Sequence, residues 1–184
     1  MEYRSLRKEE ITRELFRGFE RRQVVTDCLR REQGQWVVKS DPFIDQWSSK
    51  DYEFLVSCLR KTLEKDGVVY GAFSEGVLKG FASVEGELFG TRKQYLDLTS
   101  LHVSEELRGR GAGKKLLAMA ADWAKERGAM KLYISAHSAL ETQRFYESQG
   151  CVDAQERRME HVEQEPYDRQ MELVLVPAES RMDR

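Results

Sequence analysis

The chain has 184 residues, which is enough for one well-cored domain and short for two. Charged residues make up 34% and hydrophobic residues 40%, and the formal net charge of -2 gives no support for general nucleic-acid binding. No apolar run approaches the ~18–20 residues of a membrane span, so we expect no membrane association. Three scattered histidines, three widely spaced cysteines and an N-terminus without an apolar signal region predict no metal site, free thiols and a cytoplasmic protein.

The first half of the chain is predicted to contain two helices among short strands. Helices are expected where apolar residues recur every three or four positions, and strands where β-branched and aromatic residues run between turns. In chain order we expect a strand at 3–6, a helix at 8–19, an irregular stretch at 20–47, a helix ending near 66, and a hairpin of strands at 68–73 and 77–85. Ser48 or Ser49 is the expected N-cap of the second helix, and Gly67 can supply its left-handed C-cap.

The stretch at 20–47 leaves two interpretations open. Its aromatic residues include Trp36 and Trp47, and Pro42 breaks any helix there. The stretch is either a helix followed by a packed surface loop, or one wall of a substrate pocket in which aromatic side chains give shape and aspartates give charge.

The second half of the chain alternates strands and helices around a glycine-rich loop. We expect a strand at 95–103, the loop at 108–113, a helix at 114–127, a strand at 130–136, a helix at 138–149, a strand at 151–154, a charged loop at 156–166 and a last strand at 169–176. The crossover helix at 114–127 predicts that the strands on either side of it pair in parallel. The tail after Pro177 is polar and expected to fray.

The glycine-rich loop predicts an anion site. Unpaired N–H groups at the start of the following helix point into the loop, and the helix dipole favours negative charge there. Four basic residues add positive charge: Arg108, Arg110, Lys114 and Lys115. The glycine spacing fits neither a dinucleotide loop nor a Walker loop, so the natural guest is a phosphate or pyrophosphate of another kind. A plain tight turn is the alternative.

Arg108, Gly111 and Gly113 fill the pattern Gln/Arg-x-x-Gly-x-Gly/Ala, so the loop resembles the acyl-coenzyme A loop of the GNAT acetyltransferases. The order of the predicted elements is also similar to that family from end to end. The resemblance implies a layered α/β fold, with a mixed sheet of about six to seven strands flanked by about four helices. It implies one domain over 1–184, in which 1–90 contacts the acceptor, 95–151 binds acetyl coenzyme A and 152–176 supplies the last strands.

The resemblance also implies which residues bind the acetyl donor, acetyl coenzyme A. They are Leu101, His102, Val103, Arg108, Gly109, Arg110, Gly111, Ala112, Gly113, Lys114, Ser138, Thr142 and Tyr146. Two positions depart from the family pattern, because Ala139 stands where an asparagine is common and Thr142 where an alanine is common. Ser138 or Thr142 is the candidate for the missing polar contact.

Acetyl transfer to an amine needs a proton for the leaving thiolate and a donor for the carbonyl oxygen. The stretch from Phe145 to Cys151 is similar to the family sequence Leu/Phe-Tyr-Glu-x-x-Gly-Phe, whose tyrosine is the usual general acid. The resemblance therefore implies Tyr146 as the acid and the backbone N–H of Leu101 as the carbonyl donor. Phe is replaced by Cys151 here, which we interpret as a packing change.

The attacking amine must also be neutral, which calls for a base. Asp97 is the first candidate, and alternation along a regular strand would place it on one face with Thr99, Leu101 and Val103. A bulge in that strand would disturb the alternation. Glu85, with Glu87 beside it in the sequence, is the rival.

The acceptor is predicted from charge alone. Glu163, Glu165 and Asp168, with Asp27 or Asp45, could attract a cationic amine, although a charged run is more often a solvated loop. No residue has the setting of a covalent nucleophile, so we expect direct transfer in a ternary complex to a primary amine of a small cationic molecule. A protein or peptide amine, a coenzyme A sensor without catalysis and a nucleotide-binding module stay open, as does a homodimer.

Overall fold

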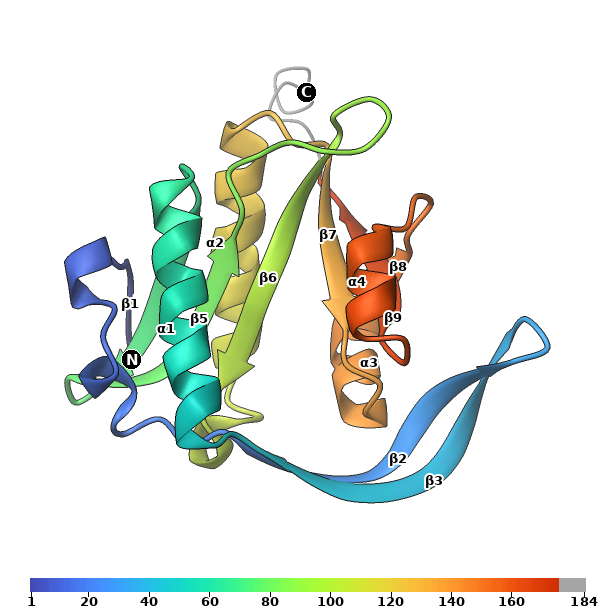
Figure 1. Cartoon of the computed structure of the whole chain (residues 1–184), viewed down its shortest axis with the longest axis horizontal. Coiled ribbons are helices and arrows are strands. Elements are labelled where there is room, and N and C mark those ends of the chain that lie inside the picture. The colour runs from blue at the N-terminus through green and yellow to red at the C-terminus, as the bar shows by residue number, and fades with distance from the viewer. Residues whose placement is uncertain (176–184) are drawn as a thin grey trace, which may run out of the picture.

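The structure is a computed structural model that describes residues 1–175 (Figure 1). Its centre is a seven-stranded sheet in the order β1-β4-β5-β6-β7-β9-β8. The strands of this sheet are β1 (Glu2–Ser5), β4 (Val68–Ser74), β5 (Val77–Val84), β6 (Tyr95–Val103), β7 (Lys131–Ala136), β8 (Val152–Asp153) and β9 (Arg169–Val174). Only β6 and β7 pair in parallel within it, as the crossover helix predicted.

Four α-helices are present in the described part of the chain, and they cover both faces of the sheet (Figure 1). They are α1 (Ser49–Glu64), α2 (Ala112–Glu126), α3 (Leu140–Ser148) and α4 (Met159–Gln164). One apolar core lies between the sheet and α2, and a second lies between the sheet and α1. The layered α/β fold with about seven strands and four helices is therefore confirmed.

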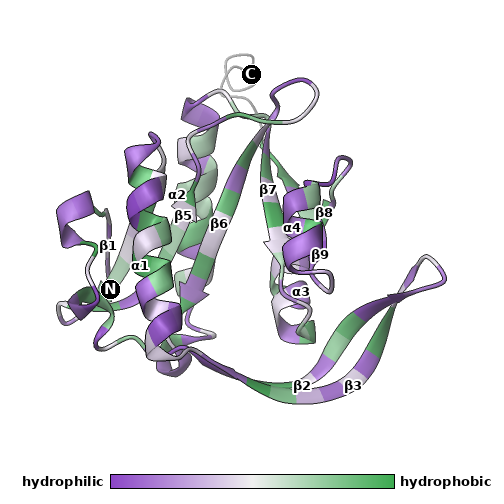
Figure 2. Cartoon of the chain, viewed as in Figure 1, coloured by the Kyte–Doolittle hydropathy of each residue, from purple (hydrophilic) through white to green (hydrophobic). Residues whose placement is uncertain are grey.

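The strands of the sheet and the inward sides of α1 and α2 carry most of the hydrophobic residues (Figure 2). By contrast, α4 is largely hydrophilic in the same view and buries no residue. Among the helices that the structure describes, none combines the length and the apolarity that a membrane crossing needs. Packing of α1 and α2 on opposite faces fixes the middle of the sheet, where β5 and β6 lie.

A β-bulge in β6 sets which side chains face which layer. Ser83 of β5 pairs with Ser100, but Val84 pairs with Leu98, so Thr99 is the extra residue. Leu98 precedes the bulge and Leu101 follows it, and both pack into the core beneath α2. In a regular strand two residues three positions apart would point to opposite faces.

β6 and β7 separate just beyond this bulge. They pair from Tyr95 to Leu98 and from Lys131 to Ile134, and their register ends there. The two strands diverge below this point in Figure 1. Their facing edges therefore border a gap that reaches both faces of the sheet.

The helix predicted at 8–19 is wrong. The segment forms two short 3₁₀ turns, at Lys8–Glu10 and Glu14–Phe16, and a third such turn occurs at Glu105–Leu107. Ile11 and Phe16 are at most 1% exposed, so the segment follows the surface of the core beneath α1 instead of a helical path. Tertiary packing overrides the apolar spacing here.

Of the two interpretations of 20–47, the helix followed by a surface loop is wrong. This stretch forms a separate two-stranded hairpin of β2 (Arg22–Glu32) and β3 (Gln35–Gln46). Gln33 and Gly34 both have positive φ at its turn, as a tight hairpin connection requires. Pro42 is accommodated because the pairing register shifts between Val25 and Asp27, opposite it.

Two smaller boundaries also differ from the sequence. α4 occupies part of the predicted charged loop at 156–166. Asp66, with φ of 59°, takes the left-handed conformation after α1, while Gly67 is needed because a Cβ there would lie 2.6 Å from the carbonyl oxygen of Val84. The predicted end of the last strand at 176 and the tail lie outside the described residues.

Ser48 is the N-cap of α1 and forms a capping box with Asp51, whose side chain accepts from the Ser48 backbone N–H at 2.7 Å. Replacing Ser48 by Ala should lower the free energy of unfolding by ~1 kcal/mol, because one N–H of the first turn loses its acceptor. A urea titration of S48A measures this. S49A is the matched control and should leave the midpoint unchanged; an equal loss in both variants would contradict the cap assignment.

Candidate active site

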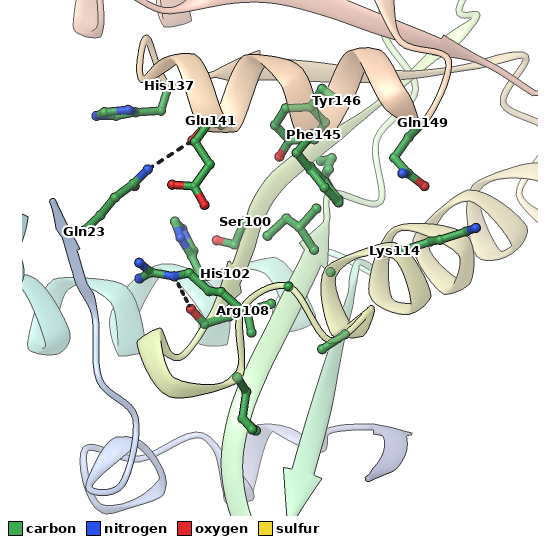
Figure 3. Close-up of a pocket in the computed structure, with 18 of the residues that line it drawn as sticks. Gln23, Ser100, His102, Arg108, Lys114, His137, Glu141, Phe145, Tyr146 and Gln149 are labelled. Carbon is green, nitrogen blue, oxygen red and sulfur yellow. Dashed lines mark hydrogen bonds between the residues drawn. The ribbon is translucent and has the colours of Figure 1, made fainter. Parts of the chain in front are cut away.

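A cavity of about 430 Å³ opens where β6 and β7 separate (Figure 3). Its walls come from β6, the loop that leads into α2, the end of β7, α3 and the start of β2. The predicted donor-binding residues that line it are Leu101, His102, Val103, Arg108, Gly109, Gly111, Ala112, Gly113, Lys114, Thr142 and Tyr146. Arg110 and Ser138 do not line it, and Ser138 is instead buried at 5% exposure.

The start of α2 forms one end of this cavity. Gly111 is the N-cap, with φ of 84°, and Gly109 before it has φ of 74°. Only glycine adopts such values without strain, which explains the glycine spacing of the loop. The Arg108 Nε donates to the Val103 carbonyl oxygen at 3.1 Å and ties the loop to β6. The free N–H groups of the first helical turn and the basic side chains suit an anionic group such as a phosphate.

One side of α3 forms the opposite wall. Glu141, Thr142, Phe145, Tyr146 and Gln149 line the cavity at helical spacing, and Figure 3 shows the Glu141 carboxylate pointing into it. Burial raises the pKa of Tyr146, and the nearby Cys151 and Asp168 raise it further. The phenol therefore stays protonated at neutral pH and is available as a proton donor.

The β2 strand closes the cavity from the side of the hairpin. The Gln23 Nε2 donates to the Thr142 Oγ1 at 3.4 Å, which joins the hairpin to α3 (Figure 3). Arg21 beside it is 7% exposed and pairs with Asp45 of β3 at 2.8 Å. The interpretation of 20–47 as one wall of a pocket covers Arg21 and Gln23. Sequence reasoning assigned neither residue a role, because the docking of a hairpin is a tertiary event with no local pattern. It also missed Glu141, which a helical wheel would have placed one turn before Phe145 on the same side of α3.

Two histidines line the cavity, and both are held neutral. Burial lowers the pKa of His102 to about 3, with the cations Arg21 and Arg108 adding to the effect. Burial also lowers the pKa of His137. The His137 Nδ1 is positioned to accept from the Ala139 backbone N–H at 3.1 Å, so its neutral ring carries the proton on Nε2.

Neither predicted base candidate lines the cavity. Asp97 is 2% exposed, and its Oδ2 accepts from Arg158 Nη1 at 2.9 Å and lies 2.6 Å from His161 Nε2. Because of the bulge at Thr99, Asp97 faces α4 while Leu101 faces the core beneath α2. The shared face that a regular strand would give is therefore absent, and the bulge disturbs the alternation as the sequence analysis allowed. Glu85 lies beyond the end of β5, where its Oε1 accepts from the Thr62 hydroxyl at 2.7 Å.

Comparisons with known proteins agree with this geometry. Residues 26–151 match the model of the acetyltransferase (GNAT) family, and no curated protein matches the sequence. Nourseothricin acetyltransferase has a similar structure, with a TM-score of 0.72 at 16% identity over 95% of this chain and 98% of that one. A Bacillus anthracis str. Ames protein described as a streptothricin acetyltransferase, in complex with acetyl coenzyme A, gives 0.71 at 16% over the same shares.

An aminoglycoside 6'-N-acetyltransferase complexed with coenzyme A is a more distant structural relative. Its TM-score is 0.55 at 15% identity, over 71% of this chain and 83% of that one. At these identities the likenesses concern the fold, whereas the family match covers more than half of the sequence and includes β6, α2 and α3. The chain therefore belongs to the acetyltransferase (GNAT) family and is an acyltransferase whose acetyl donor is acetyl coenzyme A.

Proposed function

We propose that this enzyme transfers the acetyl group directly from acetyl coenzyme A to a primary amine of a small cationic molecule. The observation that carries the proposal is the cavity between β6 and β7, which has a helix N-terminus at one end and acidic residues next to its β7 wall. These residues, here called the acidic rim, are Glu163 in the last turn of α4 and Glu165 and Asp168 between α4 and β9. They do not line the cavity themselves. Asp168 Oδ2 accepts from the hydroxyl of Ser135, which lines the cavity, at 3.0 Å.

The donor is assigned to the end of the cavity at α2. Its pyrophosphate would lie on the free N–H groups of the first turn, near Arg108 and Lys114. Among residues 1–175, no strand pairs with the edge of β6 beyond Leu98 on the side of β7, so this edge can pair with the pantetheine arm. The N–H of Leu101 on that strand is our candidate donor to the thioester carbonyl oxygen. In this proposal the chain forms one domain. Residues 95–151 bind the donor, residues 1–90 largely contact the acceptor, and residues 152–176 supply the last strands.

The acidic rim is assigned to the acceptor. Negative charge at a cavity mouth raises the local concentration of a cationic amine, as the sequence predicts for this loop. The charge of Glu165 acts on His137, which lines the cavity, and the charge of Asp168 acts on Tyr146. Both acidic side chains therefore lie within electrostatic reach of the site. Asp45 is already paired with Arg21, so it contributes less free negative charge.

The hairpin favours a small acceptor over a polypeptide. The Leu29 backbone N–H donates to the Ser138 carbonyl oxygen at 2.8 Å, and the Arg30 guanidinium lies 4.4 Å from the centre of the Tyr167 ring. The hairpin thus reaches from the start of α1 across to α3 and the acidic rim (Figure 1). A site bordered in this way suits a compact molecule. Amine-bearing antibiotics in the names of the similar structures are consistent with this class.

The test is thiol release from acetyl coenzyme A with polyamines, aminoglycosides, amino acids and a lysine peptide as acceptors. Release with one small cationic class is expected. E165Q should then raise KM for that class and weaken the salt dependence of kcat/KM, because it removes one charge of the acidic rim. Asp122→Asn, on the outer side of α2, is the matched charge control. Release with the lysine peptide alone would contradict the small-acceptor assignment.

Arg108→Ala should weaken acetyl coenzyme A binding about tenfold or more, because a charge-assisted contact contributes ~1.5–3 kcal/mol. Isothermal calorimetry measures the change. Arg110→Ala removes the same charge from the same loop but lies outside the cavity lining, so its loss should be smaller. Equal losses would show that only the net charge of the loop matters.

Tyr146→Phe should lower kcat by about a hundredfold, because the leaving thiolate loses its proton donor, and should leave the Kd for acetyl coenzyme A unchanged. Stopped-flow thiol release and calorimetry separate the two effects. Tyr70→Phe on β4 is the control for loss of a hydroxyl elsewhere. Unchanged kcat in Tyr146→Phe would reject the acid role.

A further inference from the structure

Asp168 lies beside the β7 wall of the cavity, directly before β9. Its Oδ2 accepts from the Ser135 hydroxyl at 3.0 Å, and the Gln170 Nε2 donates to the same Ser135 oxygen at 3.0 Å. The two contacts are compatible only if the Ser135 proton points at Asp168. This arrangement engages Oδ2 and leaves Oδ1 for another donor.

Ser135 and Asp168 lie on the face of the sheet that is opposite α2. Tyr133, two residues before Ser135 on β7, stacks on His161 of α4 with ring centres 6.0 Å apart. Ile134, between them, points into the core beneath α2. A donor bound at α2 and an acceptor on the face of α4 would therefore meet in the gap between β6 and β7. The β7 wall of that gap presents Ser135, with Asp168 behind it.

We propose that Asp168 is the general base that removes a proton from the ammonium group of the acceptor. This inference rests on the proposed function, since it requires a cationic amine. It gives Asp168 a role beyond the attraction that the acidic rim exerts as a whole.

Glu141 of α3 is the rival carboxylate at the cavity, and the experiment below compares it with Asp168. Three other titratable groups near the gap are less suited to this role. His102 is neutral, but a pKa of about 3 makes it a very weak base. The lone pair of His137 is occupied by the Ala139 N–H, and its Nε2 carries the proton. Asp97 Oδ2 is occupied by Arg158 and His161, and Asp97 does not line the cavity.

The surroundings of Asp168 strengthen it as a base. Burial raises the pKa of Asp168 to about 6, and Glu165 on its own loop adds to the effect. The hydrogen bond from Ser135 on β7 and the charge of His161 on α4 lower this pKa in part. Tyr146 of α3 is also a titratable neighbour, since the charge of Asp168 raises the pKa of its phenol. A carboxylate with a pKa higher by ~2 binds a proton about a hundredfold more tightly, yet at pH 7 it is still mostly ionised.

The proton balance of the reaction closes with these groups. Asp168 takes one proton from the ammonium, and the freed nitrogen lone pair forms the C–N bond to the acetyl carbon. The C–S bond breaks, and the thiolate takes the phenol proton of Tyr146. The extra proton on the new amide nitrogen returns to the Tyr146 phenolate. Asp168 then releases its proton to water.

The test compares Asp168→Asn and Asp168→Glu with the wild-type enzyme, using the best amine of the panel and hydroxylamine, which is neutral at pH 7. We expect Asp168→Asn to lower kcat for the cationic amine by about 10²–10⁴-fold. It should also abolish the acid limb near pH 6 and leave the Kd for acetyl coenzyme A unchanged. Transfer to hydroxylamine should be spared, because that amine needs no base before attack. Asp168→Glu should restore part of the rate.

Glu141→Gln is the matched comparison, because the Glu141 carboxylate points into the cavity from α3, whereas Asp168 adjoins the cavity through its contact with Ser135. Loss of the acid limb in Glu141→Gln, or its survival in Asp168→Asn, would overturn the inference. Equal loss of both acceptors in Asp168→Asn would also overturn it, because that result indicates a structural role. A wild-type enzyme that acetylates only a lysine peptide would reject the small acceptor, and the same variants assayed on that peptide would still decide the role of Asp168.

Discussion

The site depends on one irregularity in the sheet, the bulge at Thr99 of β6. The Thr99 Oγ1 lies 2.8 Å from the Ser83 Oγ, so the extra residue is held by a hydrogen bond to β5. From this point β6 follows β5 and leaves β7, whose pairing with it ends at Ile134. The gap that results exposes a strand edge and connects the two faces of the sheet. Because of this gap, the helix N-terminus on one face and the acidic rim on the other can serve the same site.

A buried ionic cluster holds the second half of the site in place. Asp97 is buried beneath α4, and Arg158 and His161 at that helix supply its partners. Removing either partner would leave a buried carboxylate poorly satisfied, which is costly in a protein interior. The cluster therefore fixes a helix that buries no residue of its own. Asp97, which the sequence suggested as a base, serves here to position the segment that carries Asp168.

The sequence was informative where structure is local. Helical spacing and strand patterns placed α1, α2 and β6 within a few residues of their observed bounds. The sequence was uninformative where distant segments decide the conformation. The hairpin at 22–46 and the 3₁₀ turns near the N-terminus take their form from contacts with α3 and α1. The bulge at Thr99 likewise left no sequence signal that fixes its position.

The hairpin of β2 and β3 has a further consequence for how the enzyme meets its acceptor. Two-stranded hairpins are marginally stable by themselves, and in the described part of the chain this one pairs with no strand of the central sheet. An isolated bridge joins Cys28 to Ala139, in the segment between β7 and α3. The order of the hairpin is therefore maintained by a few docking contacts around the cavity mouth. A molecule that fills the cavity adds to those contacts, so part of its binding free energy goes into ordering the hairpin. Acceptor affinity and local stability of residues 22–46 are thus thermodynamically linked.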